Sequence, residues 1–175
     1  MVKILFQIRG NFKCLFLRIF LLCLWLRADT NTVLDANGRV QQWKDLSSGE
    51  LVFSQNTASK RPFLTANGFN NKPSLTFNGT QVLSGGDVLD LGTSSRSMFV
   101  LGNYSNTTNG YIYAKALFGP SDSRYGFGGG NTNLFSFYLD NSDRTAQVNP
   151  GGNFSNSYLY RTEINRQNNT NTLLR

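Results

Sequence analysis

SLTFNG, residues 74–79, is the stretch that most clearly decides the fold class of this chain. Polar and apolar side chains alternate up to Phe77, which is the period of a β-strand with one buried face. Leu75 and Phe77 are therefore predicted to share that buried face. The Asn-Gly pair that follows tolerates the positive φ angles of a tight turn. The stretch predicts a strand that ends in a turn.

The same pattern of strand and turn recurs along the chain. FSFYL at 135–139 and YLYRTEI at 158–164 alternate in the same way, and MFVL at 98–101 is a continuous apolar run. Such a run is typical of a central strand that is covered on both faces. Turn residues such as DANG at 35–38 separate these segments. Roughly ten short strands at this spacing predict an all-β fold, a two-sheet antiparallel β-sandwich of the jelly-roll type.

The composition agrees with many short strands joined by turns. Asn, Gly and Ser are frequent, and 14 Phe and 7 Tyr supply most of the bulky apolar surface. Aromatic residues favour pleated surfaces, and this many of them are incompatible with a disordered chain. No segment holds a helical period for three turns.

Charge and missing residue types exclude several classes of function. The formal net charge is +7, but four of the 17 basic residues precede residue 23, where no acid occurs. The other charges are scattered singly, so we expect no nucleic-acid partner. The chain has no histidine, which excludes Ser-His-Asp and Cys-His catalysis and His-ligated metals. Both cysteines, Cys14 and Cys23, lie near the N-terminus, so no disulfide framework supports the rest of the chain.

Residues 1–22 form a basic, apolar leader. Charged residues precede an apolar run over 19–26, which is the order found in a secretory signal. Arg18 interrupts the apolar part, and the run is shorter than the ~20 residues of a membrane helix. One interpretation is a signal peptide or short anchor, which implies a secreted or surface protein that meets a membrane only through this segment. The alternative is that the apolar run is simply the first buried strand, at 24–26. The remaining residues, 23–175, are predicted to form one domain.

Four stretches in order carry a family resemblance: LWLRAD at 24–29, GRVQQWKD at 38–45, PSLTFNGT at 73–80 and SMFVL at 97–101. Together they resemble the laminin-G-like members of the concanavalin A-like lectin/glucanase superfamily, most closely its bacterial and phage-borne versions. The resemblance implies a jelly roll, usually non-catalytic, that serves carbohydrate binding or adhesion in secreted, cell-surface or virion proteins. Such domains continue beyond the strand at 172–174, so a chain that ends at Arg175 would leave the sandwich incomplete, with an unpaired edge.

Sugar recognition needs a flat aromatic face together with amide and hydroxyl groups. Loops that combine Tyr, Asn and Gly make Tyr104, Tyr125 and Asn131 the candidate ligand-binding residues. The alternative for these side chains is a role in packing or in turns. We assign Trp25 and Trp43 to the core.

Metal binding and catalysis have fewer candidates. Asp140, Asn141 and Asp143 follow a predicted strand and offer oxygen ligands for Ca²⁺, although Asp and Asn in turns often cap their own backbone. The only glutamates, Glu50 and Glu163, are isolated, whereas glycoside hydrolases need two carboxylates that flank one bond. We therefore expect no enzyme.

The leading hypothesis is a non-catalytic carbohydrate-binding or adhesion module of a secreted, surface or virion protein. One alternative is a structural sandwich domain of a phage fibre or head-decoration protein, whose partners would be subunits of the parent protein or further copies of this chain. The other alternative is a degenerate relative of glycoside hydrolases.

Overall fold

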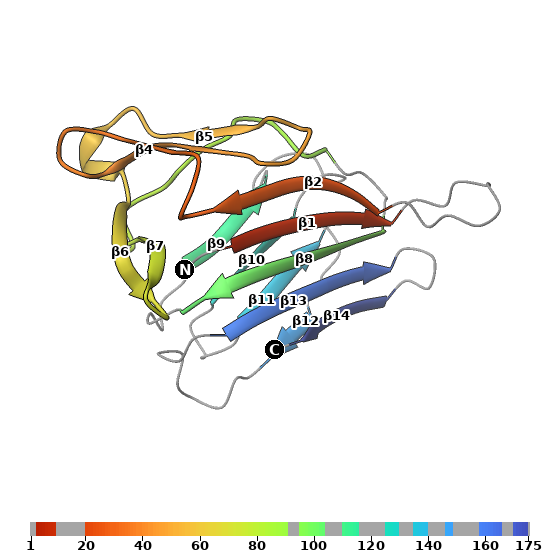
Figure 1. Ribbon diagram of the computed structural model, residues 1–175. Coiled ribbons are helices and arrows are strands. Elements are labelled where there is room, and N and C mark those ends of the chain that lie inside the picture. Colours follow the sequence, from red (N-terminus) through yellow and green to blue (C-terminus); the bar gives the residue numbers. More distant parts are fainter. Residues whose placement is uncertain are drawn as a thin grey trace.

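The computed structural model describes residues 3–9, 20–90, 95–103, 110–115, 125–129, 135–139, 146–148, 158–165 and 170–174. These residues form antiparallel sheets, and the only helix among them is the short 3-10 turn η1 (Ala58–Lys60). The predicted all-β class is therefore confirmed. Figure 1 shows how the strands are arranged.

The largest sheet has five strands and joins the two ends of the chain. In spatial order they are β14 (Thr170–Leu174), β13 (Tyr158–Asn165), β8 (Ser95–Gly102), β1 (Lys3–Arg9) and β2 (Phe20–Arg27). β8 is a central strand, as predicted, because it pairs with β13 on one side and β1 on the other. Of its two faces only one is fully covered, since Met98 and Val100 are buried and Phe99 and Leu101 are partly buried. β1, which lies within the predicted leader, separates β8 from β2.

A second sheet of four strands lies behind the first in the view of Figure 1. Its strands, in spatial order, are β12 (Ala146–Val148), β11 (Phe135–Leu139), β10 (Tyr125–Gly129) and β9 (Gly110–Lys115). Two smaller sheets complete the described fold. One consists of β3 (Thr32–Leu34), β4 (Val40–Lys44) and β5 (Val52–Ser54), and the other of β6 (Phe63–Phe69) and β7 (Lys72–Thr76).

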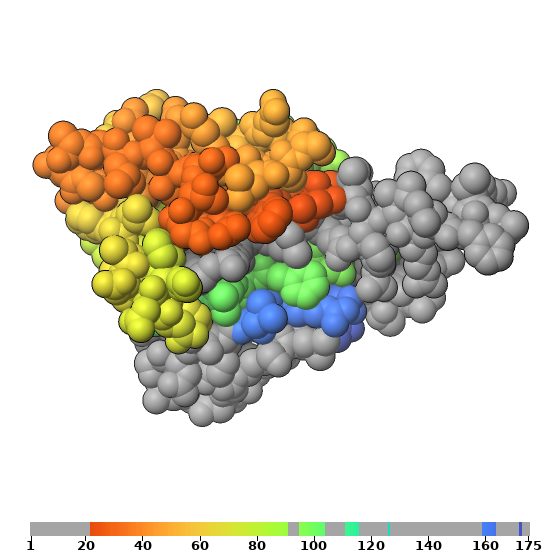
Figure 2. All heavy atoms as spheres, in the orientation of Figure 1, coloured from red at the N-terminus to blue at the C-terminus, as the bar shows by residue number. Residues whose placement is uncertain are grey.

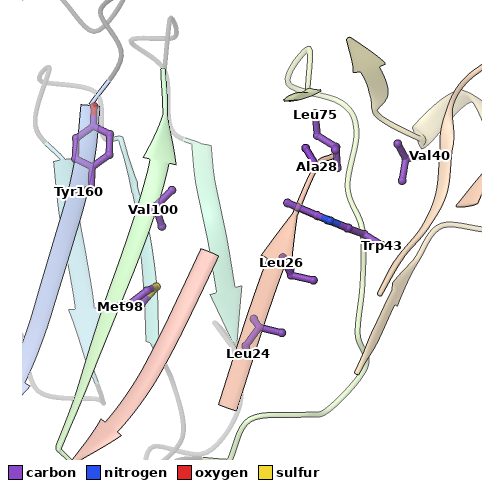
Figure 3. Close-up of a cluster of buried hydrophobic side chains, with 9 residues drawn as sticks. All are labelled: Leu24, Leu26, Ala28, Val40, Trp43, Leu75, Met98, Val100 and Tyr160. Atoms are coloured by element: carbon purple, nitrogen blue, oxygen red, sulfur yellow. The ribbon is translucent and has the colours of Figure 1, made fainter. Parts of the chain in front are cut away.

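The core is a cluster of buried apolar side chains from five strands and one turn (Figure 3). Its members are Leu24, Leu26, Ala28, Val40, Trp43, Leu75, Met98, Val100 and Tyr160. Ile112 and Tyr113 of β9 pack against this cluster, so the four-stranded sheet also contacts the core. Complete burial of a large apolar side chain stabilises the folded state by about 1.5–3 kcal/mol, so this cluster contributes substantially to stability.

Hydrogen bonds from two side chains join the stretches LWLRAD and GRVQQWKD. Trp43 Nε1 donates to the carbonyl of Arg27 at 2.7 Å, and its ring is only 3% exposed. Asp45 Oδ1 accepts from the backbone N–H groups of Trp25 and Ser47, at 2.7 Å and 2.8 Å. The two stretches therefore form one unit at the margin of the five-stranded sheet.

Two predictions of buried side chains are wrong. Trp25 is 36% exposed, because Leu24 and Leu26 occupy the inner face of β2 and alternation turns Trp25 outward. Phe77 is 40% exposed although Leu75 is buried as predicted, because β7 ends at Thr76 and Phe77 follows it outside the strand. The assignment of Trp43 to the core is confirmed.

Candidate functional site

One surface of the five-stranded sheet faces away from the core, and we call it the open face. Its described side chains come from β2, β8 and β13, three strands that are far apart in the sequence. The open face consists of Trp25, Arg27, Ser97, Phe99, Leu101, Leu159, Arg161 and Glu163. Figure 2 shows atoms of these strands at the surface that faces the viewer.

Strand alternation and register explain why these residues share a face. The buried side chains Met98, Val100 and Tyr160 occupy the inner face, so their neighbours in sequence point to the other side. Phe99 pairs with Arg161 in the register of β8 and β13. The open face is therefore a consequence of the same pleat that builds the core.

Trp25 and Phe99 lie in one row across the sheet. Leu5 of β1 is the register partner of both residues, so two strand spacings, about 10 Å, separate their backbones. Leu159 is 53% exposed in the adjacent row. Trp25 and Leu159 are thus the exposed members of the open face, Phe99 and Leu101 are partly buried, and Ser97 is buried.

Each of these two rings has an arginine beside it. The guanidinium of Arg27 lies 6.0 Å from the centroid of the Trp25 ring, and that of Arg161 lies 5.7 Å from the centroid of Phe99. At these distances a cation is attracted by the ring quadrupole. The arginines also supply N–H donors at the edges of the rings.

A carboxylate binds each arginine. Arg27 donates to Asp29 through Nε at 3.0 Å and through Nη2 at 2.6 Å, and these bonds raise the pKa of Arg27. Arg161 Nη2 donates to Glu163 Oε1, which also accepts from the hydroxyl of Ser97 at 3.3 Å. The open face thus combines flat rings with both donors and acceptors, which suits a ligand that has an apolar face and hydroxyls at its edge.

A small apolar hollow lies beside Leu22 and Cys23 of β2 and has a volume of about 250 Å³. It is lined by Leu22, Cys23, Ser48, Gly49, Leu51 and Leu89. Burial, and next the charge of Asp45, raise the pKa of the Cys23 thiol, so the thiol is less reactive than an exposed one.

Lys115 at the end of β9 binds the loop that precedes β8. Its Nζ donates to Asp87 Oδ1 and to Asp90 Oδ1, both at 2.8 Å, and to the carbonyl of Val88 at 2.6 Å. Burial of the ammonium lowers the pKa of Lys115, but the hydrogen bonds to the two carboxylates outweigh it and the pKa is raised. These two aspartates therefore hold a loop in place, and their carboxylates are engaged by a cation of the chain itself.

The residues predicted to bind ligands fall mostly outside the described part of the chain. Tyr104 and Asn131, and the proposed calcium ligands Asp140, Asn141 and Asp143, lie outside the described residues. Tyr125 is the first residue of β10, where its backbone pairs with Lys115 and Leu139. The roles proposed for all of these residues remain predictions.

The open face was missed in the sequence, although one signal for it was present. In LWLRAD two leucines flank one tryptophan, and a strand can turn only one of these two sets inward. Choosing the two leucines for the core would have placed Trp25 and Arg27 together on the surface. The contribution of β8 and β13 could not have been found in this way, since it depends on long-range register.

Glu50 and Glu163 lie in different elements, as the sequence suggests. Glu163 belongs to β13, and Glu50 lies in the turn before β5 with a φ angle of 50°. Among the described residues, no group of three or more Cys, Asp or Glu side chains is placed to hold a metal ion. In the same part of the chain, no helix has the length and apolar character needed to cross a membrane.

In comparisons with known proteins, no family model, no curated protein and no solved structure matches this chain.

Proposed function

We propose that this chain is a non-catalytic carbohydrate-binding or adhesion module of a secreted, surface or virion protein. In this proposal its sheets are the layers of a laminin-G-like jelly roll, and the ligand lies on the open face. The observation that carries the proposal is the exposed Trp25 in one row with Phe99, with an arginine beside each ring. The apolar face of a pyranose ring can stack on such rings while its hydroxyls meet Arg27, Arg161 and the carboxylates that bind them.

A glycan array with the purified chain tests this proposal, followed by titration of the best glycan. Trp25→Ala should weaken binding about tenfold, which corresponds to ~1.4 kcal/mol of lost ring stacking. Because Trp25 is partly exposed, its removal should leave the fold intact, which circular dichroism can verify. Binding that is unchanged in Trp25→Ala would exclude the open face as the ligand site.

Phe63→Ala is the matched control for that variant. Phe63 is 38% exposed and also has an arginine beside it, since the Arg39 guanidinium lies 4.3 Å from its ring centroid. It belongs to the β6–β7 hairpin and not to the five-stranded sheet. Its loss should leave glycan binding unchanged.

The second candidate is a structural domain of a fibre or head-decoration protein, and one observation favours it. Leu159 is 53% exposed on the same face as Trp25, and exposed aliphatic and aromatic groups are also typical of protein interfaces. No binding to any glycan, together with a stable oligomer that Leu159→Ser dissociates, would support this candidate over the first.

A further inference from the structure

The charges on the described side chains of the open face are paired within the chain, although the chain as a whole is strongly basic. A formal net charge of +7 would suggest an acidic ligand, such as a sulfated or uronic-acid polysaccharide. The described side chains of the open face contradict that suggestion. Arg27 is bound to Asp29, and Arg161 is bound to Glu163.

The pair of Arg27 and Asp29 uses the geometry that an acidic ligand would need. Two N–H groups of one guanidinium bind the two oxygens of one carboxylate, at 3.0 Å and 2.6 Å. This bidentate arrangement is the strongest that arginine makes with a carboxylate, and it is the same that would bind a carboxylate of a ligand. An acidic ligand would first have to displace Asp29, whose charge also repels it.

The pair of Arg161 and Glu163 has a similar effect beside Phe99. Glu163 is held by the Ser97 hydroxyl in addition to Arg161, so two partners fix the carboxylate at this position. Its side chain is 27% exposed, which leaves it accessible to a ligand. A sugar hydroxyl can donate to this carboxylate and accept from an N–H of Arg161, whereas a sulfate or carboxylate group would meet a surface that is already neutralised.

Resting on the proposed function, we infer that the ligand of the open face is a neutral, hydroxyl-rich glycan and that acidic glycans are discriminated against. Salt screens exposed charges but does not screen stacking or neutral hydrogen bonds. Because a neutral ligand carries no charge, its binding should depend little on ionic strength.

The test compares matched neutral and acidic probes with the full chain. On the glycan array, each neutral glycan that binds is compared with its sulfated counterpart, and dextran with dextran sulfate in affinity electrophoresis. The expected result is that sulfation weakens binding at least about tenfold, and that the Kd of the neutral glycan changes less than about twofold between 50 and 500 mM NaCl.

Glu163→Gln gives a second readout, because it keeps the shape of the side chain and frees the charge of Arg161. This variant should gain binding to dextran sulfate, by about fivefold or more at 50 mM NaCl, and lose that gain in high salt. Asp90→Asn is the control, since it changes the net charge equally on the loop that binds Lys115. Equal gains in both variants would mean that total charge alone attracts the polymer, and this would overturn the inference.

The two proposals fail in different ways. If wild-type protein binds no glycan in any buffer, the proposed function itself is wrong. If it binds glycans but prefers sulfated or uronic-acid forms, and loses them in high salt, the function stands and the inference of a neutral ligand is overturned. The comparison of neutral with sulfated glycans on the wild-type protein decides between these outcomes even if Glu163→Gln does not fold.

Discussion

At the scale of single residues, Asp45 is a buried carboxylate that binds the backbone of two separate stretches. It is 6% exposed, and it accepts hydrogen bonds from two backbone N–H groups and from the Ser47 hydroxyl, the last at 2.5 Å. One of those N–H groups belongs to Trp25, so Asp45 also fixes the outer margin of the strand that carries the open face. Its place in the stretch GRVQQWKD has a structural reason that needs no ligand.

Asp45→Ala is expected to lower the free energy of unfolding by about 2–4 kcal/mol, because it leaves buried donors without an acceptor. Asp45→Asn, which keeps one oxygen, should lose about half as much. Urea denaturation followed by circular dichroism measures both. Asp87→Ala serves as control, since Asp87 is 87% exposed and should change the stability by less than about 1 kcal/mol. A loss in Asp45→Ala as small as the loss in this control would contradict the role assigned to Asp45.

Asp35 gives stability a dependence on pH. Its Oδ2 accepts from Arg61 Nη1 at 2.9 Å, and its Oδ1 accepts from the backbone N–H groups of Arg39 and Asn37. The bond with Arg61, followed by the bond with the Arg39 backbone, lowers the pKa of Asp35 below its ordinary value of 3.8. The folded state therefore holds the ionised form more firmly than the unfolded state does.

The lowered pKa of Asp35 determines how stability changes with pH. Well above pH 3.8 both states are ionised and the stabilisation by Asp35 is complete. As the pH falls below this value, the unfolded state takes up its proton first, and the stabilisation is lost as the pH passes the lower pKa of the folded state. The difference in stability between wild-type protein and Asp35→Asn should be constant above about pH 5 and shrink below pH 4. A difference that stays constant down to pH 2 would contradict this assignment.

At the scale of elements, the sequence predicts the strands well where alternation is strict and poorly where it is absent. FSFYL and YLYRTEI overlap β11 and β13, and the turn at 35–38 is present, with Gly38 at a φ angle of 74°. β1 was missed because basic residues followed by an apolar run describe a secretory leader and a strand equally well. No local pattern tells them apart, since the pairing of β1 with β8 joins residues more than 80 positions apart.

Removal of β1 tests whether the N-terminal segment is a cleaved leader or a strand of the fold. Deletion of residues 1–9 would leave the edge of β2 and the edge of β8 without a partner along their whole length, and such exposed edges promote aggregation. We expect the shortened chain to lose its cooperative thermal transition and to elute as aggregates in size-exclusion chromatography. Deletion of residues 1 and 2, which precede β1, should change neither property. If the chain without β1 keeps its Tm, the strand is dispensable and the prediction of a cleaved leader gains support.

At the scale of the whole molecule, the open face shows what a sequence alone does not provide. Trp25, Phe99 and Arg161 are unremarkable in their own segments, and only the order of strands in the five-stranded sheet brings them into one row. The pairing of the two arginines, in contrast, is local in sequence. Each arginine is neutralised by an acid two positions away, an arrangement that a count of charges does not register.

The two tryptophans can report whether the sheets unfold together. Trp43 lies in the β3–β4–β5 sheet and is buried, whereas Trp25 lies in the five-stranded sheet and is partly exposed. Because Trp43 packs in the same cluster as Met98 and Val100, we expect both sheets to unfold in one transition. In Trp25→Phe and in Trp43→Phe, the single remaining tryptophan should give a fluorescence midpoint equal to the midpoint measured by circular dichroism of that same variant. Trp43→Phe should have the lower Tm of the two, since it loses the bond to the Arg27 carbonyl. A fluorescence transition of Trp43 that precedes the circular dichroism transition would show that the three-stranded sheet is a separate unit, and the core drawn in Figure 3 would then not act as one.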